Sequence, residues 1–276
     1  MDAETAAYIE NIVDRRLIVA FDLFGTLLST DSIVGKIAEH YGDKAESISA
    51  AWRKYQLEYT WRLNSMSVYE PFDIVTQRSL IHAISEATAG TPPPTASDPA
   101  IVSILAAYAT LSPYPDVKAA LSPIARIKHL QPIIFTNGTP TQVDAALRSA
   151  PAVLAPFGTS RERSMLCADE IGKYKPHPMI YQFLAAKMGK SIAVGERHGG
   201  IDEVVLVSAN AFDVVGAQAV GVTAVWVDRA GAGWCDALVE GPPQFTVTGL
   251  EELGGVLETI LAEKAKVWDE ASGRDI

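Results

Sequence analysis

Cysteine is scarce in this sequence, and no cluster of zinc-binding residues is evident. The chain has two cysteines, Cys167 and Cys235, among 276 residues. So few cysteines in so long a chain do not make a disulfide framework, and no Cys-x-x-Cys pair or His/Cys cluster predicts zinc. The first residues, Met-Asp-Ala-Glu-Thr, are acidic and lack the basic and apolar parts of a signal peptide. These features favour a reducing, cytoplasmic location.

Long apolar runs and an excess of positive charge are also missing. There is no apolar run of about eighteen residues, so we expect no membrane span. Lysine and arginine total 23 against 33 aspartates and glutamates, which gives a net charge of −10. Nucleic-acid binding needs a basic face, so we exclude that class of partner. A small anionic substrate stays possible, because a few basic residues in a cleft can reverse the local potential. The sequence contains no Gly-x-Ser-x-Gly motif, so it does not predict a serine-hydrolase triad.

The stretch from Leu17 to Phe21 is an unbroken apolar run that leads directly into Asp22. Such a run predicts a strand buried on both faces, as in a parallel sheet. An aspartate at its carboxyl end lies where open α/β sheets bind ligands, and Gly25 suits a tight turn beside it. From this stretch alone, Asp22 could equally cap the next turn.

The rest of the chain divides into a helical block and an alternating block. Between residues 30 and 112 the pattern predicts helices only, with one apolar face formed by Ile48, Trp52, Tyr55, Tyr59 and Leu63. After residue 112 the sequence predicts helices at 117–130, 140–150, 179–188, 211–220 and 249–266, and strands at 132–135, 204–207 and 223–227. Residues 190–203 are interpreted as a loop. This alternation predicts an α/β fold. We expect a Rossmann-like parallel sheet core (residues 1–29 and 113–276) with an inserted all-helical cap (residues 30–112).

Polar residues follow the predicted strands and converge at one edge of the sheet. They are Asp22, Thr26, Thr136, Asn137, Ser208, Asn210 and Asp213, together with Lys175 before a helix. A buried carboxylate beside a lysine and several hydrogen-bond donors is what nucleophilic catalysis requires. The lysine keeps the carboxylate ionised, and the donors stabilise charge that develops in the reaction.

Four short motifs in order resemble those of the haloacid dehalogenase superfamily. They are Asp22-Leu-Phe-Gly-Thr-Leu27, Thr136-Asn-Gly138, Lys175-Pro176 and Ser208-Ala-Asn-Ala-Phe-Asp213. Within that superfamily the sequence is most similar to the (S)-2-haloacid dehalogenase family. The segment Trp52-Arg53-x-x-Gln56-Leu57-Glu58-Tyr59-Thr60-Trp61 is similar to its cap-helix signature, and Tyr174-Lys-Pro-His-Pro178 with Tyr181 is similar to a second one. The resemblance covers roughly residues 17 to 250.

The resemblance implies hydrolysis of (S)-2-haloalkanoic acids to (R)-2-hydroxyalkanoic acids through an ester on an aspartate. It makes Asp22 the nucleophile and pairs Lys175 with Asp22 and with the substrate carboxylate. Asp213, with Asn210 and Ser208, would position and activate the hydrolytic water. Thr26, Thr136 and Ser208 would supply hydroxyl donors.

The resemblance also assigns residues to substrate binding. Arg53, Asn137 and Phe72 would hold the departing halide, and Arg53 could instead hold the substrate carboxylate. Leu57, Phe72 and Phe212 would line an apolar wall, while Tyr181 could order Lys175 or Asp213. Phe24 and Phe212 stand where some relatives have tyrosine and tryptophan, and Thr136 stands where the family usually has serine. The substrate-binding set is therefore Phe24, Arg53, Leu57, Phe72, Thr136, Asn137, Lys175, Tyr181 and Phe212.

Two absences separate this sequence from the phosphatases of the superfamily. Those enzymes typically carry an acid two positions after the nucleophile, where this chain has Phe24. They also carry an acidic residue in the fourth motif where this chain has Ser208 and Ala209. Mg²⁺ in such sites is held through carboxylates, and only Asp22 and Asp213 remain. We therefore expect neither a metal nor an organic cofactor.

Three alternatives stay open. The first is hydrolysis of azetidine-2-carboxylate, since the hydrolases of that compound resemble this family. The second is another hydrolase activity of the superfamily, such as a phosphatase, which would depend on Mg²⁺. The third is a binding protein that retains the fold without catalysis. The expected partners are a small 2-haloalkanoate and the halide product, with no nucleic acid and no membrane, and the chain could form a homodimer. The sequence does not identify the halogen or the chain length.

Overall fold

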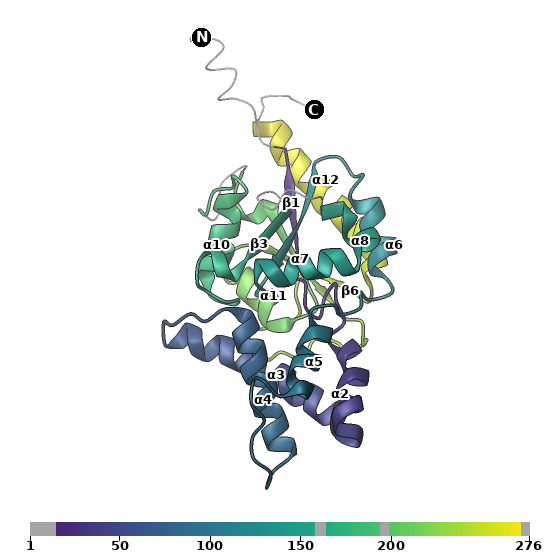
Figure 1. Cartoon of the computed structure of the whole chain (residues 1–276). Helices are drawn as coiled ribbons and strands as arrows, with labels where there is room; N and C mark the ends of the chain where they lie inside the picture. The colour runs from purple at the N-terminus through teal and green to yellow at the C-terminus, as the bar shows by residue number, and fades with distance from the viewer. Residues whose placement is uncertain (1–14, 158–163, 194–198, 272–276) are drawn as a thin grey trace, which may run out of the picture.

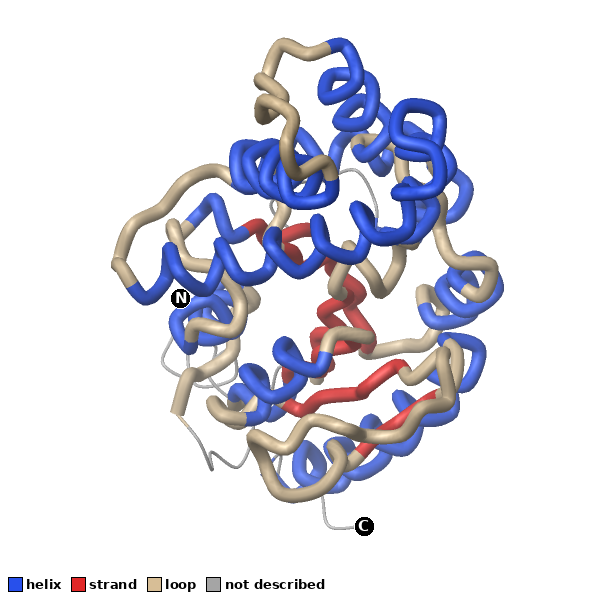
Figure 2. Tube along the Cα trace, turned by 90° about the horizontal axis from the view of Figure 1, so that it is seen from below, coloured by secondary structure: helices blue, strands red, loops and turns tan. Residues whose placement is uncertain are grey.

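The structure is a computed structural model that describes residues 15–157, 164–193 and 199–271. Its centre is a six-stranded parallel sheet with the order β3-β2-β1-β4-β5-β6. The strands are β1 (Leu17–Phe21), β2 (Leu130–Thr136), β3 (Met165–Cys167), β4 (Val204–Ser208), β5 (Thr223–Val227) and β6 (Phe245–Val247). Helices lie on both sides of the strands, which are red in Figure 2. The predicted α/β class is confirmed.

Strand β1 lies in the middle of the sheet, between β2 and β4. Each of its five residues is 0 % exposed. The prediction of a strand buried on both faces is therefore confirmed. Because all neighbouring strands are parallel, the residues that follow β1, β2 and β4 emerge at the same edge of the sheet.

One group of helices lies at this edge of the sheet, and a second group packs around the sheet. The helices that follow β1 are α2 (Val34–Tyr41), α3 (Ala45–Ser65), α4 (Phe72–Ala87) and α5 (Pro99–Tyr108). Figure 1 shows them together at one end of the molecule, below the sheet. The helices packed around the sheet are α6 (Val117–Ile124), α7 (Pro140–Ser149), α8 (Pro151–Leu154), α10 (Pro178–Lys187), α11 (Ala211–Gln218) and α12 (Leu253–Ala271). We propose that the chain divides as the sequence suggests, with residues 30–112 as the cap.

Two neighbouring linkers connect the cap to the core. The Ser29 N–H donates to the Ser112 carbonyl at 2.8 Å, and the Tyr114 N–H donates to the Leu27 carbonyl at 3.0 Å. Arg229 holds both linkers, since its guanidinium donates to the Thr26 carbonyl at 2.9 Å and to the Asp116 carboxylate at 2.8 Å. The first linker closely follows β1 in the sequence, and the second closely precedes α6. The cap is thereby anchored next to Asp22.

The structure corrects the helix that was expected over residues 117–130. Helix α6 ends at Ile124, and β2 already begins at Leu130. His129 has a φ of +65°, which a continuing helix cannot accommodate. Its carbonyl accepts a 2.7 Å hydrogen bond from the Leu17 N–H, so this segment joins the sheet.

Other local differences are small. The sequence did not predict β3 and β6, which have three residues each and are too short to give a pattern. Within residues 190–203, interpreted as a loop, Ile201–Glu203 forms a 3₁₀ turn and Lys190 forms a buried ion pair with Glu203, while 194–198 lie outside the described residues. The expected helix start at Thr139 is confirmed by a capping box with Gln142. No helix in the described part of the chain is long and apolar enough to cross a membrane.

Candidate active site

Asp22 lies immediately after β1 and is 6 % exposed. Its N–H still bonds to the sheet, donating to the Val207 carbonyl at 3.0 Å. The chain then turns at Gly25, which has a φ of +88° that glycine adopts without steric cost. The turn brings the Phe24 carbonyl back over the site, where it accepts hydrogen bonds from Asn210 and Arg53. Backbone hydrogen bonds before and after Asp22, the candidate nucleophile, therefore hold its position.

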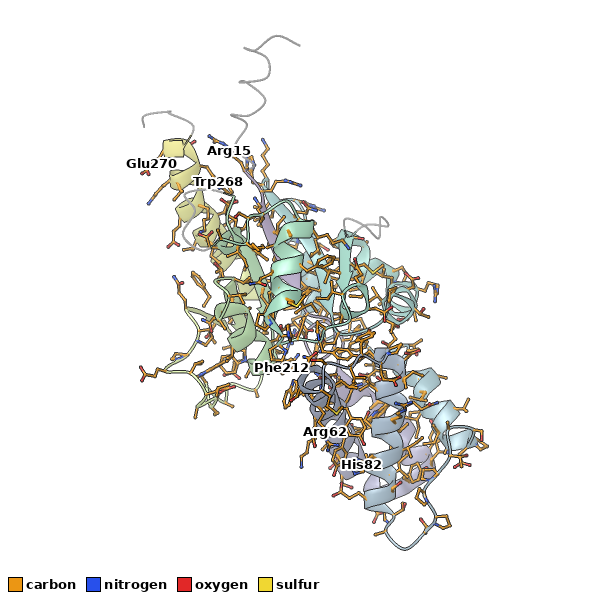
Figure 3. The ribbon with its side chains drawn as sticks, turned by 90° about the vertical axis from the view of Figure 1, so that its left-hand side faces the viewer. Arg15, Arg62, His82, Phe212, Trp268 and Glu270 are labelled. Atoms are coloured by element: carbon orange, nitrogen blue, oxygen red, sulfur yellow. The ribbon has the colours of Figure 1, made fainter. Side chains whose placement is uncertain are left out.

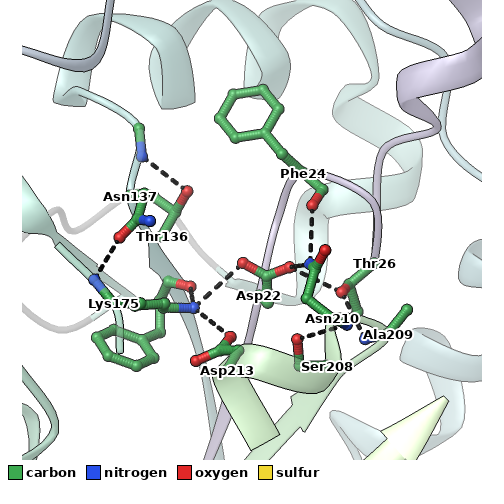
Figure 4. Close-up of polar contacts among 12 residues, drawn as sticks. Asp22, Phe24, Thr26, Thr136, Asn137, Lys175, Ser208, Ala209, Asn210 and Asp213 are labelled. Carbon is green, nitrogen blue, oxygen red and sulfur yellow. Dashed lines mark hydrogen bonds and ion pairs between the residues drawn. The ribbon is translucent and has the colours of Figure 1, made fainter. Parts of the chain in front are cut away.

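The Asp22 carboxylate accepts hydrogen bonds from three side chains (Figure 4). The Lys175 ammonium donates to Oδ1 at 3.1 Å. The Thr26 hydroxyl and the Asn210 amide each donate to Oδ2 at 2.8 Å. Thr26 also accepts from the Ala209 N–H at 2.9 Å, so this hydroxyl joins β1 to the segment after β4. These contacts orient the carboxylate and stabilise its negative charge.

Lys175 is buried, and its ammonium has three acceptors. They are the Asp22 carboxylate at 3.1 Å, the Asp213 carboxylate at 2.7 Å and the Phe135 carbonyl at 2.7 Å. An ammonium has only three N–H groups. The sequence analysis also paired Lys175 with the substrate carboxylate. That additional contact would require one of these three bonds to break.

Asp213 lies in the first turn of α11 and is 0 % exposed. Its Oδ1 accepts from the Tyr181 hydroxyl at 2.8 Å, and its Oδ2 accepts from Lys175. Burial raises the pKa of Asp213, the charge of Lys175 opposes this change, and the nearby Asp22 adds to it. Burial, with the charge of Asp213, also raises the pKa of Tyr181 well above its usual value, so the phenol remains a donor. The structure thus places Tyr181 against Asp213, and its ordering role stays a prediction.

Arg53 extends from α3 of the cap to the core. Its Nη2 donates to the Asn210 side-chain oxygen at 3.1 Å and to the Phe24 carbonyl at 3.4 Å, and its Nη1 donates to Gln56 at 2.8 Å. These bonds use three of the five N–H groups of a guanidinium, and the other two make no hydrogen bond with a described residue. Asn210 therefore connects the cap arginine to the Asp22 carboxylate.

Gln56 and Tyr108 belong to the same network, although the sequence analysis gave them no role. The buried Gln56 amide donates to the Thr76 hydroxyl at 2.9 Å and to the Tyr108 hydroxyl at 3.1 Å, while its oxygen accepts from Arg53. The available signal was a polar residue one turn after Arg53 in the cap-helix signature. Gln56 thus holds the outer side of the arginine, opposite Asn210.

Aromatic rings cover the site from the cap side. Phe24 stacks on Tyr108 with ring centroids 5.5 Å apart and lies 5.8 Å from Phe72. Gly138 faces the Phe24 ring so closely that a Cβ there would be 2.7 Å from Cε2. The Phe24 side chain lies away from the polar contacts in Figure 4. Phe24, Phe72 and Tyr108 thus form one aromatic cluster beside the polar contacts.

Four further predicted site residues lie at its margins. Thr136 accepts from the Gly138 N–H at 3.0 Å and Ser208 accepts from the Asn210 N–H at 3.1 Å, so both hydroxyls hold the backbone where a strand ends. Phe212 packs edge-to-face on Trp61 of the cap, 5.6 Å between centroids, and Figure 3 shows it at the junction of cap and core. Leu57 is half-buried on α3, one turn after Arg53.

A cavity of about 210 Å³ lies on the cap side of Arg53. Arg53, Gln56, Trp52 and Tyr108 contribute to its lining, whereas Asp22 does not. Within the described residues, no three or more His, Cys, Asp or Glu side chains are grouped so that they could hold a metal ion. The Lys175 ammonium forms ion pairs with both site carboxylates, Asp22 and Asp213.

The chain is similar to known proteins over most of its length. A model of the haloacid dehalogenase-like hydrolases matches residues 17–221. The chain is 32 % identical to (S)-2-haloacid dehalogenase 4A of Burkholderia cepacia, covering 87 % of this chain and 91 % of that protein. It is 28 % identical to haloacetate dehalogenase H-2 of Moraxella sp. (strain B), covering 85 % and 95 % respectively.

Solved structures agree with the sequence comparison. The L-2-haloacid dehalogenase from Xanthobacter autotrophicus with chloropropionic acid covalently bound superposes with a TM-score of 0.72 at 26 % identity, covering 88 % of this chain and 98 % of that one. A dehalogenase with an intermediate complex gives a TM-score of 0.73 at 30 % identity, covering 89 % and 98 %.

Proposed function

Because the chain belongs to the haloacid dehalogenase-like hydrolases, as a member of their (S)-2-haloacid dehalogenase family, we propose that it hydrolyses (S)-2-haloalkanoates to (R)-2-hydroxyalkanoates and halide. The observation that carries this proposal is the pair of buried carboxylates on one ammonium. Asp22 and Asp213 both accept hydrogen bonds from Lys175. One carboxylate can then act as the nucleophile while the other serves water in the next step.

In the first step, Asp22 displaces the halide from the α-carbon. Oδ2 already accepts two hydrogen bonds and Oδ1 accepts one, so Oδ1 is the oxygen with more free lone-pair density. Its attack forms the C–O bond of an ester, breaks the carbon–halogen bond and inverts the α-carbon. The negative charge passes from the carboxylate to the halide. Halide is a weak base that leaves without a proton, which agrees with Phe24 at the position where phosphatases carry an acid.

Arg53 is the side chain best placed to bind the anions of this step. Lys175 has no N–H left, while Arg53 keeps two that contact no described residue. We assign the departing halide or the substrate carboxylate to these two groups. Phe24 and Phe72 then contact the carbon chain of the substrate.

In the second step, water hydrolyses the ester at the Asp22 carboxyl carbon. Asp213 accepts a proton from the attacking water and passes it to the ester oxygen that came from Asp22, which leaves with the product as its hydroxyl. The second water proton is released to solvent as the Asp22 carboxylate forms again. One water oxygen thereby enters the Asp22 carboxylate. Because the bond to the α-carbon is not broken again, the product keeps the inverted configuration.

We extend the proposal to a reaction without metal or organic cofactor, carried out in the cytoplasm by a homodimer. The ammonium of Lys175, which lies between the two carboxylates, supports the first point. The proposed location rests on the composition of the sequence, and the proposed homodimer rests on the resemblance to the family. Light scattering of the purified chain measures its oligomeric state directly.

The deciding experiment combines a substrate panel with isotope labelling. We expect chloride release from (S)-2-chloropropionate and no turnover of azetidine-2-carboxylate, and the reverse result would favour the second activity. In ¹⁸O water, a single turnover should label Asp22 and leave the first product unlabelled. Asp22→Asn should abolish turnover, whereas the matched change Asp73→Asn, at an exposed position on α4, should not. Label absent from Asp22 in active enzyme would refute the covalent mechanism.

A further inference from the structure

The cap holds the backbone directly before Lys175 through one asparagine. Asn64 lies near the end of α3 and makes two hydrogen bonds with Tyr174. Its side-chain amide donates to the Tyr174 carbonyl at 2.7 Å, and its side-chain oxygen accepts from the Tyr174 N–H at 3.0 Å. This pairing fixes both the position and the direction of the chain at residue 174.

The core holds the next residue in the same way. The Lys175 N–H donates to the side-chain oxygen of Asn137 at 2.9 Å, as Figure 4 shows. Two successive N–H groups therefore bond to asparagine oxygens, one from the cap and one from the end of β2. The position of the Lys175 backbone depends on both.

The Tyr174 side chain also lies against the cap. The ring is 0 % exposed, its hydroxyl donates to the Glu70 carbonyl, and its centroid is 5.2 Å from Tyr69 and 6.0 Å from Phe72. The segment that carries the lysine is thus packed on the cap by its side chain and hydrogen-bonded to it by its backbone. None of these contacts involves the reacting atoms.

We propose that Asn64 is a positioning residue that couples docking of the cap to the placement of Lys175. This inference rests on the proposed function. The ammonium must reach Asp22 at 3.1 Å and Asp213 at 2.7 Å together, so a small shift of its backbone weakens at least one contact. Arg53 bonds the cap to the Asn210 side of Asp22, and Asn64 bonds it to the lysine side. The cap thereby fixes the nucleophile from both flanks.

The test compares two cap–core hydrogen bonds that differ in what they position. Asn64→Ala removes the pair on Tyr174. Tyr69→Phe removes a 2.6 Å bond to Asp169 but keeps the ring beside Tyr174, so it controls for cap docking in general. Misplacement of a catalytic group by about 1 Å can cost about a hundredfold in rate. We expect Asn64→Ala to lower kcat about ten- to a hundredfold with KM changed less than about threefold, and Tyr69→Phe to leave kcat within about twofold.

Equal kcat for Asn64→Ala and the unchanged enzyme, or equal losses in both variants, would overturn the proposal. A double variant with Asn137→Ala adds a second readout. Because both asparagines hold one segment, the combined loss should be smaller than the product of the single losses, and a full product would show independent roles. If Asn64→Ala does not fold, Asn64→Asp keeps the accepting oxygen and should lose part of kcat, with full activity counting against the proposal. Absence of halide release from the unchanged enzyme would instead refute the proposed function itself.

Discussion

Replacing Tyr181 with phenylalanine tests whether this tyrosine acts on the substrate or on Asp213. Its hydroxyl donates to the Asp213 Oδ1 at 2.8 Å, and both side chains are buried. Burial raises the pKa of Asp213, and the hydrogen bond from Tyr181 is one of the contributions that lower it. Tyr181→Phe removes that contribution, so the pKa of Asp213 rises further. The ionised base is then lost at a higher pH.

The size of the effect follows from the kind of bond that is removed. A hydrogen bond to a charged group contributes about 1.5–3 kcal/mol, and about 1.4 kcal/mol corresponds to a factor of ten. On the acid limb, the rate is proportional to the ionised fraction of the base. We therefore expect Tyr181→Phe to lower kcat at least about tenfold there and to retain most activity on the plateau at higher pH.

The assay is the pH dependence of kcat for halide release, with Tyr59→Phe as the matched control. Tyr59 bonds His82 on the cap and contacts none of the site carboxylates, so that profile should overlie the profile of the unchanged enzyme. A uniform loss at every pH in Tyr181→Phe, together with a higher KM, would refute the reasoning. That result would assign Tyr181 to direct substrate contact, as the substrate-binding role in the sequence analysis implied.

Three further outcomes follow from the same contacts. Thr26→Val removes the hydroxyl that bridges Asp22 and the Ala209 N–H, and we expect kcat to fall about tenfold or more while Thr26→Ser recovers most of it, measured by halide release. Gly138→Ala places a Cβ 2.7 Å from the Phe24 ring, so the ring must move; we expect KM to rise about tenfold for bulky 2-haloalkanoates and less for haloacetate. Halide release should be unchanged after dialysis against a chelator, and loss of activity that Mg²⁺ restores would favour the phosphatase-like alternative.

The polar centre of the site could be predicted because a parallel sheet brings strand ends together. Asp22 follows β1, Asn210 follows β4 and Asp213 lies one turn further, so their convergence needs only the order of strands and helices. Lys175 lies on a loop, and nothing in the local pattern brings it to the strand ends. The sequence analysis grouped it with them because a lysine beside a buried carboxylate suits nucleophilic catalysis, and the resemblance then named its partners. The structure adds the three acceptors that surround its ammonium.

Contacts between cap and core could not be predicted in the same way. Gln56 and Asn64 are ordinary polar residues on an amphipathic helix, where the usual expectation is exposure to solvent. Their roles depend on how α3 docks against α4, α5 and the loop before Lys175. The short strands β3 and β6 were missed for a related reason, since pairing with a neighbouring strand rather than local sequence stabilises three-residue edges.

The order of the two chemical steps is supported by how the buried charges act on each other. Burial is the largest cause of the raised pKa of Asp213, the Lys175 charge opposes it, and the negative charge of Asp22 raises it further. Esterification neutralises Asp22, so this last contribution disappears while Lys175 stays bound to Asp213. The pKa of Asp213 then falls, and its ionised form becomes more populated. In the proposed mechanism, alkylation of Asp22 thereby prepares Asp213 to act as the base in the hydrolytic step. The same repulsion between the two carboxylates favours the proposed first step. It ends when Asp22 transfers its charge to the departing halide near Arg53.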